Sequence, residues 1–232
     1  MTYEHSGDSW SGKPFVPVNK KEKFPLLHKK IKDQNGMTLA LIGDSISVGY
    51  NASGFVKAAP HLPAFGQQLA DGLKKSLNTD IKFFNQSRGG ATTGWGIGNV
   101  GKVLEQKPDL VMVAFGMNDG RRPGGEQRYE DNIRKLILAL RKERPNLEIV
   151  LVANMLPNIE FSDHKGHFAN RDRLLKLEKE FDHIALADVM SVTEEILKRK
   201  KFADICGNHV NHPNDFIHRL YASVILRTVG LE

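Results

Sequence analysis

The sequence contains a single cysteine, Cys206, so no disulfide can form within the chain. It also contains no apolar run of about 18 residues, so no membrane-spanning helix is expected. Its first residues, MTYEHSGDSWSGKPF, lack the apolar stretch of a signal peptide. The default expectation is therefore a cytoplasmic location, with secretion as the alternative if a signal peptide originally preceded this segment.

The charge of the chain is not concentrated enough to indicate a nucleic-acid partner. The net charge is +6, and about half of this excess lies in the first 36 residues. Basic residues do not alternate with aromatic ones, and no zinc-finger spacing is present, so nucleic acid is not expected to bind. The 232 residues, 40% of them hydrophobic, can form an α/β domain with a full core.

The first 36 residues differ from the rest of the chain. They are polar, rich in lysine and interrupted by Pro14, Pro17 and Pro25. We interpret residues 1–36 as an N-terminal arm or linker and residues 37–232 as the folded domain. The aromatic side chains of Tyr3 and Trp10 suggest that the arm packs on another surface, and an additional domain N-terminal to it remains open.

From residue 37 onward, short apolar runs alternate with segments of helical period. The runs, typical of buried parallel strands, cover residues 38–43, 80–85, 109–116, 147–154 and 183–189. The predicted helices cover residues 63–77, 96–106, 125–143, 170–181, 191–200 and 215–229, with Asp215 as the N-cap of the last. This alternation predicts an α/β fold, a three-layer α/β/α sandwich around a five-stranded parallel sheet.

Residues suited to acyl transfer follow the predicted strands. Ser45 follows the first strand, Gly90 the second and Asn118 the third, and His212 precedes the last helix. The carboxyl ends of parallel strands meet at one edge, so we expect these residues to converge there. Ser45 can attack an ester, His212 can take its proton, and the N–H groups of Ser45, Gly90 and Asn118 can form an oxyanion hole.

These residues stand in motifs that resemble those of the SGNH hydrolases, also called the GDSL-like lipase/acylhydrolase family. The matching segments are GDSI, NQSRGGAT, GMND and VNHPND, and they occur in the family's order from Leu39 to the last helix. The resemblance implies a flavodoxin-like sandwich and ester hydrolysis without a metal or other cofactor. It also implies Ser45 as nucleophile, His212 as base, and Gly90 and Asn118 as oxyanion donors.

The sequence departs from the family at the acid of the triad. The family usually has Asp three residues before the catalytic histidine, and this position holds His209. Asp204 is our first candidate for the group that orients His212, because Gly207 and the residue after it could turn the chain back. Backbone carbonyl groups are the second candidate, and Asp215 is the third.

Two other interpretations of the acidic and histidine residues compete with this one. His209, His212 and His218 invite a metal site, but they lie in and beside an irregular loop without the spacing of known zinc motifs. Asp44 and Asp119 could form a catalytic carboxylate pair. We instead expect both to hydrogen-bond neighbouring loops.

The polar loops around the predicted site favour a small polar or oligosaccharide ester as substrate. The candidate substrate-binding residues are Asn51, Arg88, Trp95 and Asn158, although Trp95 could equally be packed in the core. We therefore expect a serine esterase that removes short acyl groups, acetyl first, from a carbohydrate. A catalytically degenerate glycan-binding relative is the alternative, as is a thioesterase or lysophospholipase with the same mechanism.

Overall fold

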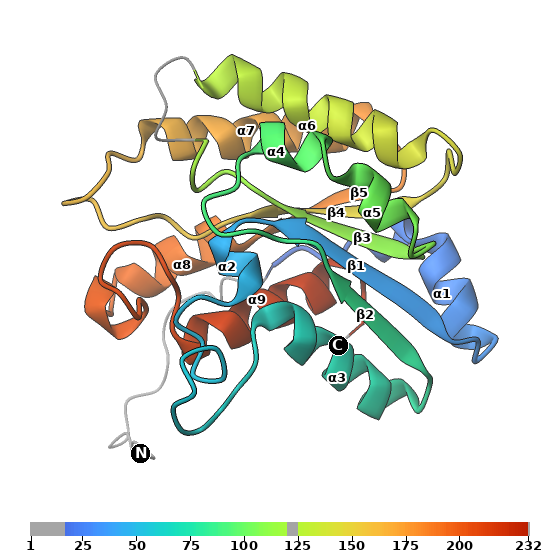
Figure 1. Cartoon of the computed structure of the whole chain (residues 1–232), viewed down its shortest axis with the longest axis horizontal. Helices are drawn as coiled ribbons and strands as arrows, with labels where there is room; N and C mark the ends of the chain where they lie inside the picture. Colours follow the sequence, from blue (N-terminus) through green and yellow to red (C-terminus); the bar gives the residue numbers. More distant parts are fainter. Residues whose placement is uncertain (1–16, 120–124, 232) are drawn as a thin grey trace.

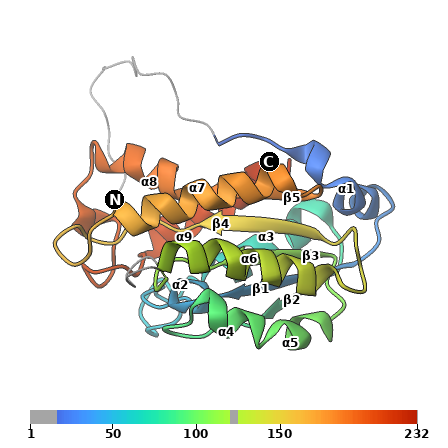
Figure 2. The ribbon, with the colours of Figure 1, turned by 90° about the horizontal axis from the view of Figure 1, so that it is seen from above.

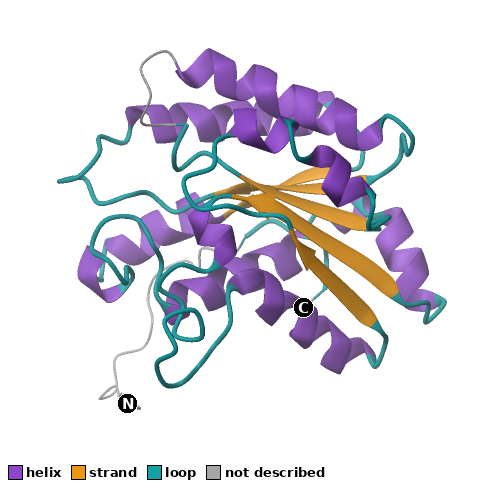
Figure 3. Cartoon of the chain, in the orientation of Figure 1, coloured by secondary structure: helices purple, strands orange, loops and turns teal. Residues whose placement is uncertain are grey.

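The computed structural model describes residues 17–119 and 125–231, which form three layers (Figure 1). The central layer, shown in orange in Figure 3, is one sheet of five strands in the order β2-β1-β3-β4-β5. The strands are β1 (Met37–Gly43), β2 (Ile81–Asn85), β3 (Leu110–Ala114), β4 (Glu148–Ala153) and β5 (Ile184–Asp188). Every neighbouring pair is parallel. The predicted α/β/α sandwich, its flavodoxin-like order and the five strands are therefore confirmed.

Helices cover both faces of this sheet and enclose a core on each side. The longer helices are α1 (Pro25–Lys32), α3 (Phe65–Leu77), α6 (Gly125–Arg141), α7 (Lys165–Glu180), α8 (Val189–Leu197) and α9 (Asp215–Thr228). The shorter ones are α2 (Ser45–Val48), α4 (Thr93–Ile97) and α5 (Val100–Leu104), with 3-10 turns at Lys21–Lys23 and Phe202–Asp204. Helices α4 to α7 lie over one face, as Figure 2 shows from above, and α3 and α9 pack side by side on the other.

Three predicted helices differ in detail from the observed ones. The helix expected over residues 170–181 begins five residues earlier, as α7. The single helix expected over residues 96–106 is divided into α4 and α5, with Gly98 and Asn99 between them. Helix α9 is capped by Asn214, whose side-chain oxygen accepts from the Ile217 N–H at 3.3 Å, so the assignment of Asp215 as N-cap was wrong. The carboxylate of Asp215 instead accepts from the Ser53 N–H at 2.8 Å and holds the loop after α2.

Part of the segment expected to be an irregular arm packs on the domain. Pro25 begins α1, where its missing N–H costs nothing, and Phe24 and Leu27 are buried. The carboxylate of buried Glu148 accepts from the N–H groups of Leu26 and Leu27, at 2.6 and 2.9 Å. Residues 1–16, including Tyr3 and Trp10, lie outside the described residues.

The direction in which successive strands are added to the sheet reverses between β1 and β3. Strand β2 lies on one side of β1, and β3 lies on its other side. Register pairs Gly43 at the end of β1 with Ala114 at the end of β3. Loops that follow these two strands therefore begin beside each other, and this is where open α/β sheets bind ligands. Within the described residues, none of the helices is both long and apolar enough to cross a membrane.

We expect Glu148→Ala to lower the free energy of unfolding by about 2 kcal/mol, because two N–H groups at the start of α1 lose their acceptor. Urea denaturation of the variant measures this, with Glu143→Ala as a control because Glu143 is exposed. An unchanged unfolding midpoint for Glu148→Ala would mean that this carboxylate does not hold α1.

Candidate active site

Ser45 lies at the start of the short helix α2, directly after β1. Gly43 ends the strand where a side chain would collide, since a Cβ there would lie 2.3 Å from the Ser47 hydroxyl and 2.5 Å from the Ala114 carbonyl oxygen. Asp44 caps α2 by accepting from the Ile46 N–H at 3.0 Å. The close packing of α2 on the sheet thus fixes Ser45, and the backbone N–H of this first helical residue has no acceptor within the helix.

His212 approaches Ser45 from the loop before α9. Its Nε2 lies 2.9 Å from the Ser45 hydroxyl oxygen, although 167 residues separate the two in sequence. The loop is closed by hydrogen bonds from the Gly207 N–H to the His212 carbonyl at 2.8 Å and from the Asn214 N–H to the Ile205 carbonyl at 3.1 Å. Burial lowers the pKa of His212, so the imidazole is neutral at physiological pH and can accept a proton.

Gly90 and Asn118 lie in the loops that follow β2 and β3. Gly90 has φ +72°, a conformation that favours glycine, and it is exposed. The side-chain amide of Asn118 donates one N–H to the Ala91 carbonyl at 2.8 Å, which ties the two loops together and leaves its second N–H for another acceptor. These groups have the chemistry required to stabilise a developing oxyanion next to Ser45.

Asp119 holds a neighbouring loop, as expected from the sequence, whereas Asp44 bonds within its own loop. The fully buried Asp44 carboxylate caps α2 within the loop after β1. The Asp119 carboxylate accepts from the N–H of Thr93 at 3.1 Å and from its hydroxyl at 2.6 Å. Burial and the nearby charge of Asp119 raise the pKa of Asp44 to about 7. Asp119 thus connects the loops after β2 and β3, and Asp44 fixes the loop after β1.

The acid expected from the sequence does not reach His212. The carboxylate of Asp204 accepts from the Lys201 N–H at 3.0 Å and caps a 3-10 turn, so the choice of Asp204 as orienting acid is not supported. His209 is exposed with φ +57°. The residue at Nδ1 of His212 is Asn208, whose amide nitrogen lies 2.9 Å away. Sequence reasoning missed Asn208 because the loop places it one residue earlier than the D-x-x-H position.

The four candidate substrate-binding residues have different environments. Arg88 is exposed, and Asn51, with φ +66°, packs against Gly207 of the histidine loop. The Asn158 amide donates to the His209 carbonyl at 2.9 Å and its oxygen accepts from the Glu160 N–H at 3.0 Å, so it ties two loops together. Trp95 is half-buried and packs on the core beneath α4.

Tyr50 is a second residue that the sequence did not reveal. Its ring meets His212 edge-on with 5.1 Å between ring centroids and stacks on Phe55 at 4.8 Å. Its hydroxyl covers Gly89, where a Cβ would lie 2.5 Å away. Tyr50 reaches this position because Gly49, with φ +103°, turns the chain at the end of α2, and only a structure reveals that turn.

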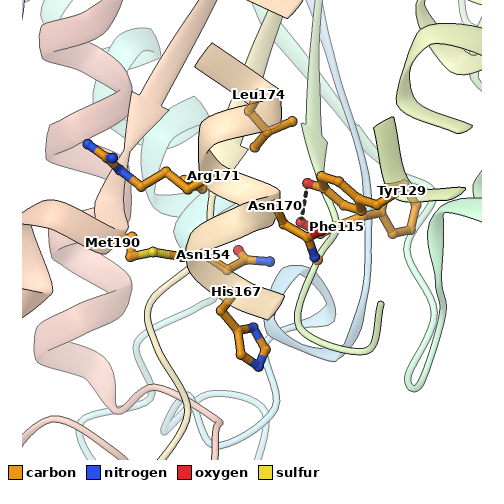
Figure 4. Close-up of a pocket in the computed structure, with 10 residues that line it drawn as sticks. Phe115, Tyr129, Asn154, His167, Asn170, Arg171, Leu174 and Met190 are labelled. Carbon is orange, nitrogen blue, oxygen red and sulfur yellow. Dashed lines mark hydrogen bonds between the residues drawn. The ribbon is translucent and has the colours of Figure 1, made fainter. Parts of the chain in front are cut away.

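A small cavity lies beside the site, at the ends of β3 and β4, between α6, α7 and α8 (Figure 4). Gly116, Asn154, Asn170 and Arg171 are among its lining residues, whereas Ser45 and His212 are not. Both amide atoms of buried Asn170 and the amide nitrogen of Asn154 have no hydrogen-bond partner within the part of the chain that the structure describes. The cavity has room for about one water molecule, which these groups can bind.

The histidines considered as metal ligands do not come together. His218 is fully buried and stacks on Phe65 with ring centroids 6.3 Å apart. In residues 17–119 and 125–231, no group of three or more His, Cys, Asp or Glu side chains is arranged to hold a metal ion.

Comparison with known proteins relates this geometry to a family. The arylesterase of Vibrio mimicus is 31% identical over 121 residues, which cover 52% of this chain and 56% of that protein. The thioesterase 1/protease 1/lysophospholipase L1 of Escherichia coli strain K12 is 29% identical over 175 residues, 75% of this chain and 76% of that protein.

The fold is shared with solved esterases. A two-domain esterase active on acetylated mannans is 21% identical and superposes with a TM-score of 0.69 over 90% of this chain and 53% of its own length. This chain thus spans about half the length of that esterase. The model of the GDSL-like Lipase/Acylhydrolase family matches residues 41–220, a range that includes Ser45, Gly90, Asn118 and His212. The chain therefore belongs to the GDSL-like Lipase/Acylhydrolase family.

Proposed function

We propose that this protein is a serine esterase that removes short acyl groups, acetyl first, from carbohydrate esters. The observation that carries this proposal is the 2.9 Å contact between the Ser45 hydroxyl and Nε2 of His212 at the switch point of the sheet. In such an enzyme the hydroxyl attacks the ester carbonyl and its proton passes to His212.

The donors around Ser45 act on the charge that develops during this attack. The backbone N–H groups of Ser45 and Gly90 and the side-chain amide of Asn118 bind the oxyanion. His212 then returns the proton to the leaving alcohol, and an acyl group stays on Ser45. Water activated by His212 releases the acid in a second attack, so every step uses groups of the chain itself.

Exposed residues near the site support a carbohydrate leaving group. Arg88 is exposed and can donate to hydroxyl groups of a sugar. Phe55, 49% exposed and stacked on Tyr50, offers an aromatic face on which a sugar ring can lie. The structural neighbour active on acetylated mannans is consistent with this substrate class.

The same loop also supports a second candidate substrate. Phe55 and Val56 are about half exposed, and such apolar side chains can bind an aryl or longer acyl group. Both curated relatives bear names of this kind, arylesterase and thioesterase/lysophospholipase. The third candidate is a glycan-binding protein without activity. In such a protein the 2.9 Å contact between Ser45 and His212 would be a structural hydrogen bond with no role in catalysis.

A panel of substrates tests the proposal. We expect the parent protein to hydrolyse acetylated oligosaccharides and p-nitrophenyl acetate with higher kcat/KM than p-nitrophenyl esters of longer acids or acyl thioesters. Ser45→Ala should abolish all of these activities with little change in Tm, and a fluorophosphonate should label Ser45 alone. Preference for long acyl chains would favour the lysophospholipase candidate, and glycan binding without hydrolysis would overturn the esterase proposal.

A second prediction concerns Asn118. We expect Asn118→Ala to lower kcat by about 10²–10³ with a small change in KM, because its amide acts mainly on charge that develops in the transition state. Asn99→Ala is the matched control, since Asn99 also donates its amide to a carbonyl, that of Trp95 at 2.9 Å, but lies outside the site. A change confined to KM would place Asn118 in substrate binding.

A further inference from the structure

The orientation of the Asn208 side chain is fixed by the backbone of its own loop. Its oxygen accepts from three N–H groups, those of Val210 at 3.0 Å, Asn211 at 2.9 Å and His212 at 2.9 Å. Rotating the amide by half a turn would place its NH₂ group against these three donors. The oxygen therefore faces the backbone and the nitrogen faces the imidazole.

This orientation determines which nitrogen of His212 carries the proton. The Asn208 amide nitrogen has two N–H groups and no acceptor capacity, and it lies 2.9 Å from Nδ1 of His212 and 3.2 Å from the Asn211 side-chain oxygen. Nδ1 must therefore accept, so the proton of the neutral ring is on Nε2. Nε2 then donates to the Ser45 hydroxyl at 2.9 Å.

A general base at Ser45 needs the opposite arrangement. Nε2 must accept the proton of the serine, with the ring proton on Nδ1. That tautomer, and the imidazolium formed during turnover, would each set an Nδ1–H against the N–H of Asn208 at 2.9 Å. Since His212 has no hydrogen-bonded carboxylate in the described part of the chain, nothing compensates this repulsion.

We propose that Asn208 is the positioning residue for His212, that it holds the imidazole in the tautomer that donates to Ser45, and that Asn208→Asp completes a Ser45–His212–carboxylate triad. This inference rests on the proposed esterase function of the same site. It predicts an enzyme whose rate is limited by one amide in the place of one carboxylate.

The substitution fits the loop. Aspartate has the shape of asparagine, so one carboxylate oxygen keeps the three backbone N–H groups and the other takes the place of the amide nitrogen, where it accepts from Nδ1–H. The three N–H groups also favour the ionised carboxylate. The Asn211 amide, now next to the second oxygen, can rotate and donate to it.

The other titratable groups around His212 do not supply this function. Cys206 lies behind Asn208, its sulfur 3.2 Å from the Asn208 oxygen, and burial raises the pKa of its thiol. The Tyr50 ring meets His212 edge-on, and His218 and Asp215 lie on α9. Asp215 is engaged by the Ser53 N–H.

Kinetics on p-nitrophenyl acetate provide the first test. We expect Asn208→Asp to raise kcat at least about tenfold, because the reverse exchange in a serine-protease triad costs about 10⁴-fold. The acid limb of its kcat/KM profile should move to higher pH, since a carboxylate at Nδ1 favours the charged imidazole. Asn211→Asp and His209→Asp place the same charge in the same loop away from Nδ1, and neither should raise kcat.

The tautomer itself can be observed without any turnover. In ¹⁵N NMR of the parent protein with labelled histidine, Nδ1 of His212 should have the shift of an unprotonated nitrogen and Nε2 that of a protonated one. In Asn208→Asp the two should exchange. A protonated Nδ1 in the parent, or a gain from His209→Asp equal to that from Asn208→Asp, would overturn the inference.

The two proposals fail in different ways. If the parent and Asn208→Asp both leave every ester of the panel intact while the NMR shifts are as expected, the tautomer assignment stands and the esterase function falls. If the parent hydrolyses esters and Asn208→Asp, folded as judged by its Tm, gives no gain, the esterase function stands and the role of Asn208 falls.

Discussion

The arrangement of the site depends on two buried carboxylates, one that fixes the loop after β1 and one that connects the loops after β2 and β3. Asp44 binds the Ile46 N–H at the start of α2, and Asp119, in the loop after β3, binds Thr93 in the loop after β2. Each loop carries one of the groups proposed to act on the ester, namely Ser45, Gly90 or Asn118. Ionising Asp44 in the core next to Asp119 is unfavourable, which explains its pKa of about 7. Burying these two carboxylates lowers the stability of the folded chain, but it fixes the positions of loops that are far apart in sequence.

The fold was predictable because its strands are short and buried on both faces. Such strands appear in the sequence as short apolar runs. The places of Ser45, Gly90, Asn118 and His212 were predictable too, since they follow from the order of the strands and the rule for their carboxyl ends. The contact between Ser45 and His212 was an expectation from chemistry, and the structure places the two side chains 2.9 Å apart. The identity of each residue as a catalytic group stays a prediction until the variants are measured.

The features that could not be predicted from the sequence depend on hydrogen bonds that form only when the chain folds. Asp204 looked suitable because it is the nearest upstream acid, but three residues of 3-10 turn direct its carboxylate to the Lys201 N–H. Asn158 looked like a residue of a polar rim, and its amide instead ties two loops together. Helix α1 was missed because its eight residues contain four lysine or histidine side chains, and the carboxylate that accepts from its first N–H groups belongs to Glu148, more than 100 residues away. In each case a hydrogen bond to a backbone group that the sequence pattern does not reveal decides where a side chain points.

The histidine loop shows the same principle at the site of the proposed chemistry. Asn208 is held by the N–H groups of the residues that follow it, as an asparagine in a turn commonly is, and this local role alone directs its amide nitrogen to His212. A base that lacks a carboxylate partner and is half buried has a lowered pKa, which agrees with the direction found for His212. Such a base remains neutral into mildly acidic solution but attracts the serine proton weakly. Asn208 therefore has two roles that conflict: its oxygen stabilises the turn, but its amide nitrogen favours the wrong tautomer of His212. An aspartate at this position would stabilise the turn and also orient the base.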